Sequence, residues 1–244
     1  YEHAQAFFSR HYRPDNAVIL VVGDVDDSVI DLIRKEYGDW APGEERAAPP
    51  TEPPQTAPRS LDVRWPSPTA PRLVWAFRIP GHNPDSKDIA ALELVDNLLF
   101  GDAGILTQRL VRDESLAYRV TGGREEFVDP CLFRIEVVLR AADQLDRVEE
   151  VLADALAEVQ VIDSARLETT RTHNTYQFLT QLDTPPNVAD ALGWHLRRGN
   201  TPDAIDRFYA TYGQITEADV ARVVSTYLIP DGRTRVTLST EASP

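Results

Sequence analysis

Two periodic patterns of apolar residues organise the chain from residue 59 onward. Residues 131–139 alternate apolar and polar positions, which predicts a strand, and its partner is predicted over residues 118–126, across a turn at Asp129 and Pro130. Residues 143–161 carry apolar side chains three and four positions apart, which predicts an amphipathic helix. Further strands are predicted over residues 61–65, 72–79 and 235–239, and further helices from Asp85 or Ser86 to 99, over 105–112 and 164–182, and after caps at Thr201 and Thr216.

The order of these elements predicts the fold class. Strands come first, followed by a helix, a hairpin, a run of helices and a last strand. This order predicts an α+β domain over residues 59–244, with an antiparallel sheet and a layer of helices.

The first part of the chain has a different pattern. Residues 17–22, AVILVV, form a short, β-branched apolar run, which predicts a strand buried on both faces. Asp26 or Asp27 is then predicted to cap a helix that runs to Tyr37. This strand and helix cannot close a core without neighbouring strands. We therefore expect residues 17–22 to pair with the second domain or with another copy of the chain, as in a homodimer.

A proline-rich stretch separates the two parts. Residues 42–58 hold six prolines and almost no large apolar side chain, which indicates a semi-rigid, extended linker. The predicted organisation is therefore a strand–helix piece over residues 1–41, a linker over 42–58 and a domain over 59–244.

Charge and composition exclude several classes of partner. The chain has 244 residues, 39 of them acidic and 25 basic, and its net charge is −14. Phosphate contacts need Lys and Arg patches, so this balance argues against nucleic acid and against an anionic membrane surface. No apolar run reaches the ~20 residues of a membrane-spanning helix. The chain has no Met and begins at Tyr1, so we expect it to be part of a longer protein.

Few residues are candidates for catalysis or for binding a metal or cofactor. Cys131 is the single cysteine, which excludes an internal disulfide and a thiolate metal cluster, and the lack of a pair favours a reducing interior. The five histidines include no pair at i,i+4 spacing, and neither HExxH nor HxxEH occurs. No metal ligand or cofactor-binding residue is therefore predicted. The remaining candidates are Arg112 and Tyr118, in the stretch LTQRLVRDESLAYRV.

Several segments in order resemble the pitrilysin, insulinase and mitochondrial processing peptidase family of zinc metalloendopeptidases, the inverzincins. The segment FSRHYRPDNAVILVVGDV, residues 8–25, is similar to the family's "yY-P-N-A-lvvvGd" late in its first homologous domain. IPGHNPD and the helix ending LLFGDAG, within residues 78–104, resemble the opening of the second domain. LTQRLVRDESLAYRV is similar to the family's "srL…LRe…glAY.v".

This resemblance implies a fold and a role. The chain would be the end of the first peptidase-like domain plus a complete second domain, of the processing-peptidase or LuxS-like type. In the family, the second domain lacks zinc and forms part of a chamber around a peptide substrate, while HxxEH lies in the first domain or in a partner subunit. By position, Arg112 would hold the substrate backbone, and the Tyr118 hydroxyl would donate to the developing oxyanion.

Alternatives remain open at this point. Six positions separate Arg112 from Tyr118, one fewer than is typical of active members, which is compatible with a working pair and with a lost one. The chain is thus interpreted as the zinc-free half of a metalloendopeptidase, inactive alone. The alternatives are a non-catalytic structural subunit of the same family, or a subunit that supplies Arg and Tyr in trans to a zinc-bearing chain.

Overall fold

The computed structural model describes residues 1–43, 50 and 52–241, and these form two compact units. Unit 1 comprises residues 1–53 and 178–202, and unit 2 comprises residues 54–177 and 203–244. The cut at 177/178 falls within one long helix, α5 (Ser164–Gln181). The candidate residues Arg112 and Tyr118 belong to unit 2.

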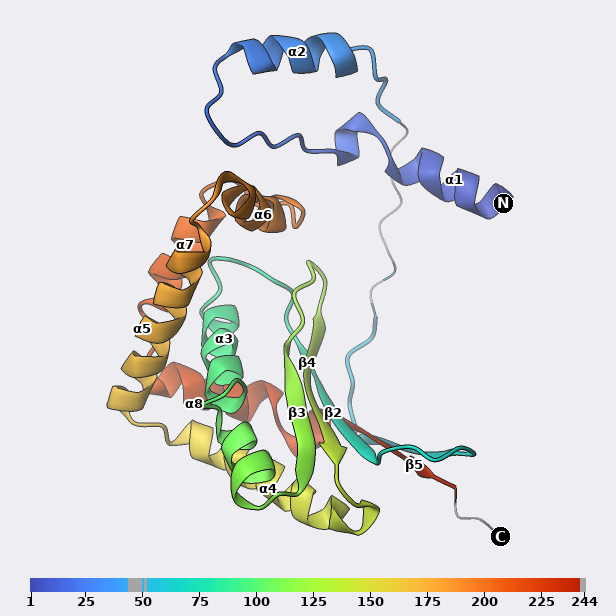
Figure 1. Cartoon of the computed structure of the whole chain (residues 1–244), viewed down its shortest axis with the longest axis vertical. Coiled ribbons are helices and arrows are strands. Elements are labelled where there is room, and N and C mark those ends of the chain that lie inside the picture. Colours follow the sequence, from blue (N-terminus) through green and yellow to red (C-terminus); the bar gives the residue numbers. More distant parts are fainter. Residues whose placement is uncertain (44–49, 51, 242–244) are drawn as a thin grey trace. The chain divides into compact units, whose positions relative to one another are not determined.

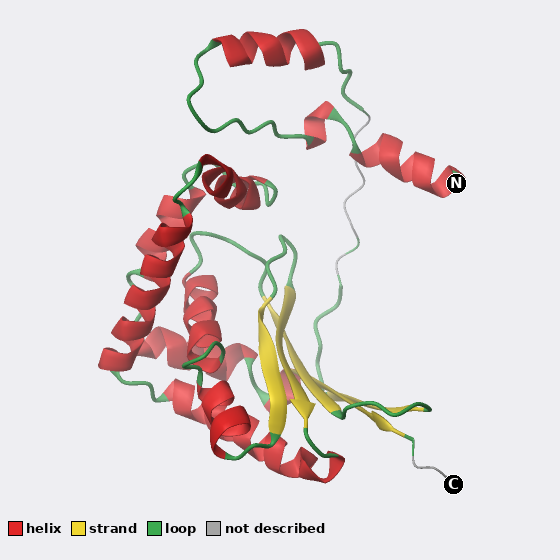
Figure 2. Cartoon of the chain, viewed as in Figure 1, coloured by secondary structure: helices red, strands yellow, loops and turns green. Residues whose placement is uncertain are grey.

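Unit 2 is built on one five-stranded sheet (Figures 1 and 2). The order is β1-β5-β2-β4-β3, and all neighbours pair antiparallel except β1 and β5, which are parallel. The predicted α+β class is confirmed, and the expected antiparallel sheet has one parallel pair, β1 with β5, at its edge. Alternation within a strand predicts its two faces but carries no information on the direction of a distant neighbour. The strands are β1 (Arg59–Trp65), β2 (Arg72–Ile79), β3 (Ala117–Arg124), β4 (Cys131–Leu139) and β5 (Arg233–Thr240).

The core lies between this sheet and the helices on one of its faces (Figure 2). Leu73 and Phe77 of β2 and Phe133 of β4 are buried, and Phe77 lies directly opposite Phe133 in the ladder. Alternating apolar positions place such residues on one face of a strand. The covering helices are α3 (Lys87–Leu99), α4 (Leu145–Gln160) and α8 (Glu217–Tyr227), and α3 contacts both of the others.

Helix α3 is apolar on nearly all sides because it is packed between the sheet and other helices. Ser86 caps it by accepting a hydrogen bond from the backbone N–H of Ile89. It ends at Phe100 and Gly101, whose φ of +80° is a conformation that glycine adopts without strain.

The remaining helices test the cap predictions. Thr216 and Asp219 bond reciprocally at the start of α8, which confirms the predicted capping box. The predicted cap at Thr201 is wrong: α7 (Ala204–Tyr212) begins later, and its first turn closes on the carbonyl of Asp203. The helix α6 (Pro185–Leu196) starts at a proline pair, and the Thr184 side chain caps it by accepting a hydrogen bond from the Asn187 N–H.

Unit 1 contains α1 (Glu2–His11), a short 3₁₀ turn η1 (Pro14–Asn16), α2 (Ser28–Tyr37) and α6. The strand predicted over residues 17–22 is wrong: these residues form no strand, and Val18, Ile19 and Val21 are exposed. A strand needs partners for its backbone groups, and no strand of the described chain pairs with this segment. Its pairing with another copy of the chain stays a prediction.

The predicted linker is described only in part, since residues 44–49 and 51 lie outside the described residues. At its end, Gln55 Oε1 accepts a hydrogen bond from Thr234 Oγ1 at 3.1 Å, so the chain contacts β5 just before β1 begins. The division at residues 41 and 59 stays a prediction. None of the helices in the described ranges is long and apolar enough to cross a membrane.

Candidate functional site

Arg112 lies on an unusual helix. Residues Thr107–Asp113 form the π-helix η2, which is closed by a bond of 3.0 Å from the Glu114 N–H to the Arg109 carbonyl. The sequence predicted an ordinary short helix here. A π-helix is rare, and its wide turns occur frequently at functional sites. Leu110 faces the core and is fully buried, so the opposite side of η2 carries Arg112 into solvent.

The turn after η2 contains a non-glycine residue whose backbone conformation is rare for residues with a side chain. Ser115 has a φ of +52° and is the one non-glycine residue with positive φ among the described residues. The next N–H, of Leu116, bonds back to the Leu110 carbonyl at 2.8 Å, which fixes the tight path of the turn. A residue with a Cβ costs about 1–2 kcal/mol in this left-handed region.

Tyr118 lies at an irregularity in the sheet. In the pairing of β3 with β4, Ala117 is opposite Leu139 but Arg119 is opposite Val138, so Tyr118 is an extra residue, as in a β-bulge. Bulges re-aim side chains and are common next to active sites. The Tyr118 side chain is exposed, and its hydroxyl makes no hydrogen bond with any residue that the structure describes.

Ion pairs with α4 hold this segment in place. Arg147 donates from Nε and Nη2 to the two carboxylate oxygens of Glu114, at 2.8 and 2.9 Å. These hydrogen bonds hold the pKa of the Glu114 carboxyl below its ordinary value. Arg109 of η2 donates from Nη2 to Glu158 Oε2 of α4. Glu114, between Arg112 and Tyr118, is therefore tethered to α4, while the two candidate side chains are exposed.

The two candidates present a cation and a hydroxyl donor. Arg112 is about half exposed, and the nearest carboxylate oxygen paired with it is Asp102 Oδ1, at 4.0 Å. An exposed guanidinium with so weak an intramolecular partner can bind a carbonyl or carboxylate oxygen of a ligand. The described part of the chain contains no group of three or more His, Cys, Asp or Glu side chains that could hold a metal ion.

A second polar cluster, which sequence reasoning missed, is buried between α3 and β3. The Arg124 side chain is 2% exposed and donates from Nη2 to Glu93 and Glu126, at 2.8 and 2.7 Å. The Arg124 N–H donates to Asp96 Oδ2 at 3.0 Å. Burial raises the pKa of Asp96 to about 7, and the charge of Glu93 adds to this rise. The signal in the sequence was the pair of acids at i,i+3, Glu93 and Asp96, among the apolar residues of α3.

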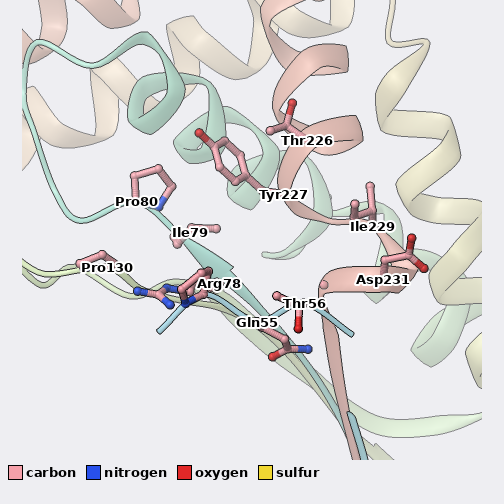
Figure 3. A pocket seen from close by; sticks show the side chains of 12 residues that line it. Gln55, Thr56, Arg78, Ile79, Pro80, Pro130, Thr226, Tyr227, Ile229 and Asp231 are labelled. Carbon is pink, nitrogen blue, oxygen red and sulfur yellow. The ribbon is translucent and has the colours of Figure 1, made fainter. Parts of the chain in front are cut away.

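A pocket of about 530 Å³ opens where β2 ends, beside α8 and residues 54–56 (Figure 3). Its aromatic residue, Tyr227, points its hydroxyl away from Gln55 and Thr56 in Figure 3 and donates it to Asp88 Oδ2 at 2.5 Å. Burial raises the pKa of Tyr227 to about 12, so this phenol stays protonated and hydrogen-bonded to Asp88. Neither Arg112 nor Tyr118 lines this pocket.

Comparison with known proteins decides the family. The model of the peptidase M16 inactive domain matches residues 1–174, well over half of the chain. The chain belongs to the peptidase M16 family. This confirms the resemblance seen in the sequence, including the assignment to the inactive domain of the family.

Relatives of the M16 chain are longer proteins. It is 23% identical over 228 residues to the zinc protease PqqE of Helicobacter pylori, covering 91% of this chain and 51% of that protein. The chain is 24% identical over 239 residues to a probable mitochondrial-processing peptidase subunit beta of Schizosaccharomyces pombe. This match covers 90% of this chain and 50% of that protein. The chain thus spans about half the length of these curated relatives.

Solved structures show the same M16 fold. A protease from Helicobacter pylori has a TM-score of 0.87 and 23% identity, over 98% of this chain and 58% of that chain. The M16 inactive domain from Pseudomonas fluorescens has a TM-score of 0.77 and 20% identity, over 99% of this chain and 57% of that chain. At these identities, the likeness shows the fold alone.

Proposed function

We propose that this chain is the zinc-free half of an M16 metalloendopeptidase, forming one wall of the substrate chamber and contacting the peptide. The observation that carries the proposal is the convergence of three backbone irregularities on Arg112 and Tyr118. The π-helix, the positive φ of Ser115 and the bulge at Tyr118 lie within 12 residues, from Thr107 to Tyr118. Such strained or irregular backbone is concentrated at functional sites.

Each of the two side chains has a role in this proposal. The Arg112 guanidinium donates to a backbone carbonyl of an extended peptide and holds it in register. The Tyr118 hydroxyl donates to the carbonyl oxygen that gains negative charge when the peptide bond is attacked. Lewis-acid chemistry would come from a zinc ion held outside this chain, by the upstream domain or a partner subunit.

The proposal includes the organisation of the parent protein. Residues 1–41 would be the last strand and helix of the zinc-bearing domain, residues 42–58 the linker, and residues 59–244 the zinc-free domain. The exposed apolar side chains of Val18, Ile19 and Val21 support this assignment, because a lost sheet would cover them. Pairing of this segment in a homodimer is the alternative for the isolated chain.

The test is zinc content and peptide cleavage by this chain alone, by the upstream half of the parent alone, and by their mixture. We expect no zinc and no cleavage with this chain alone, and both with the mixture. Tyr118→Phe should lower kcat of the mixture by about 10²–10³-fold, the usual effect of losing one oxyanion donor. Tyr176→Phe is the matched control, because Tyr176 is also an exposed tyrosine of unit 2.

Other results would support different functions. Zinc bound by the isolated chain would overturn the assignment to the zinc-free half. No cleavage by the mixture would favour a structural subunit, a reading that the shortened spacing between Arg112 and Tyr118 also permits. Cleavage restored only by a separately encoded zinc-bearing chain would indicate a subunit that acts in trans.

A further inference from the structure

Arg140 contacts three successive residues of the candidate site. It directly follows β4, and its backbone N–H donates to the Leu116 carbonyl at 2.9 Å. Its side-chain Nε donates to the Ala117 carbonyl at 3.3 Å. Its guanidinium carbon lies 4.8 Å from the centroid of the Tyr118 ring. One residue therefore contacts the backbone that leads into the bulge and the ring that the bulge presents.

The bulge explains why Tyr118 needs such a contact. Regular pairing of β3 with β4 is interrupted at Tyr118, so the ladder does not hold this residue as it holds Val120. The Tyr118 ring is 60% exposed and lacks the packing that fixes the rotamer of a core residue. A side chain that reaches over the bulge, as Arg140 does, can restrict the ring.

The charge of Arg140 suits this task. A guanidinium over the face of a tyrosine is attracted by the negative face of the ring. Arg140 makes no ion pair with any residue in the described ranges, so no carboxylate competes with the ring for it. The contact is made to the ring face and leaves the hydroxyl free at the rim.

We propose that Arg140 is the positioning residue for Tyr118. It ties residues 116–117 to the end of β4 and fixes the ring direction, so that the hydroxyl is aimed before a substrate arrives. Its effect on turnover rests on the proposed function of Tyr118, whereas its effect on the ring does not. The positioning role of Arg140 and the catalytic role of Tyr118 can therefore be tested separately.

The first experiment uses the isolated chain and measures the order of the Tyr118 ring by NMR, through the χ1-dependent couplings and the ring-proton shifts. Arg140→Met keeps much of the apolar stem but removes the charge and the Nε donor. We expect its Tyr118 couplings to move to rotamer-averaged values, and Arg140→Lys, which keeps the charge, to retain part of the order. Arg64→Met is the control, because Arg64 is on β1 at the opposite edge of the sheet. An equally ordered ring in folded Arg140→Met would overturn the proposal.

The second experiment measures cleavage by the reconstituted enzyme. Arg140→Met should lower kcat by about 3–10-fold with KM within twofold of wild type, and Arg140→Lys should recover part of the loss. Combined with Tyr118→Phe, Arg140→Met should cause no further loss, since both act through one hydroxyl. Losses that multiply would refute positioning. If Tyr118→Phe itself has no effect while the NMR result holds, the proposed function of Tyr118 fails and the structural role of Arg140 stands.

Discussion

The buried acid Asp96 makes the stability of this fold depend on pH in an unusual direction. Its carboxylate shares a cluster with Glu93 and Glu126, and the Arg124 guanidinium supplies positive charge between them. The site also has no spare room: a Cβ at Gly123 would lie 2.3 Å from Asp96 Oδ2. Three carboxylates around one guanidinium leave an excess of negative charge, which a proton on Asp96 reduces.

The direction in which stability changes with pH follows from the direction of the pKa shift of Asp96. The pKa of Asp96 is about 7 in the folded chain, raised by burial and then by Glu93 from an ordinary value of 3.8. The folded state therefore binds this proton more tightly than the unfolded state, and its contribution is complete below about pH 4 and lost as pH rises through about 7. At about 1.4 kcal/mol for each pKa unit, the full shift corresponds to about 4 kcal/mol, of which about 2–3 kcal/mol falls between pH 5 and pH 7.

Asp96→Asn isolates this effect. The amide oxygen can still accept the Arg124 N–H, but the side chain no longer titrates. Urea unfolding followed by tryptophan fluorescence should show the free energy of unfolding of wild type falling from pH 5 to 8, relative to that of Asp96→Asn, by about 2–3 kcal/mol. Because Glu114 and Asp219 have lowered pKa values, their contributions are lost only at acid pH and cancel in this difference.

Asp154→Asn, an exposed acid of α4, is the matched control and should run parallel to wild type. Parallel profiles for wild type and Asp96→Asn between pH 5 and 8 would refute the reasoning. A direct readout is the carboxyl ¹³C shift of Asp96, which should titrate near pH 7.

Two further predictions concern backbone conformation. Ser115→Gly should raise the free energy of unfolding by about 0.5–1 kcal/mol, because glycine adopts the positive φ without strain, and a decrease in urea unfolding experiments would contradict this. Gly123→Ala should lower it by more than about 2 kcal/mol, because φ is +124° there and the new Cβ would meet the Asp96 carboxylate; unchanged unfolding would show that this junction can relax.

Local sequence determined the elements whose stabilising contacts lie within a few residues. The alternation over 131–139 predicted β4 and its buried face, because side chains of a strand point alternately to two sides. The capping box at Thr216 was predicted for the same reason, since both of its hydrogen bonds join residues three positions apart. The order of elements and the motifs around Arg112 and Tyr118 were enough to predict the α+β class and the M16 family.

Only the tertiary structure decided the features that depend on distant partners. Residues 17–22 have the pattern of a strand but form none, because a strand also needs neighbours that the described chain does not supply. The parallel pairing of β1 with β5 likewise joins segments far apart in sequence. The π-helix that carries Arg112 and the bulge at Tyr118 were not indicated by the apolar pattern, which predicted an ordinary helix and a regular strand. Arg140 against Tyr118, and Arg124 against Asp96, are contacts that neither periodicity nor motif contains, because they form only when the strands and α3 are brought together.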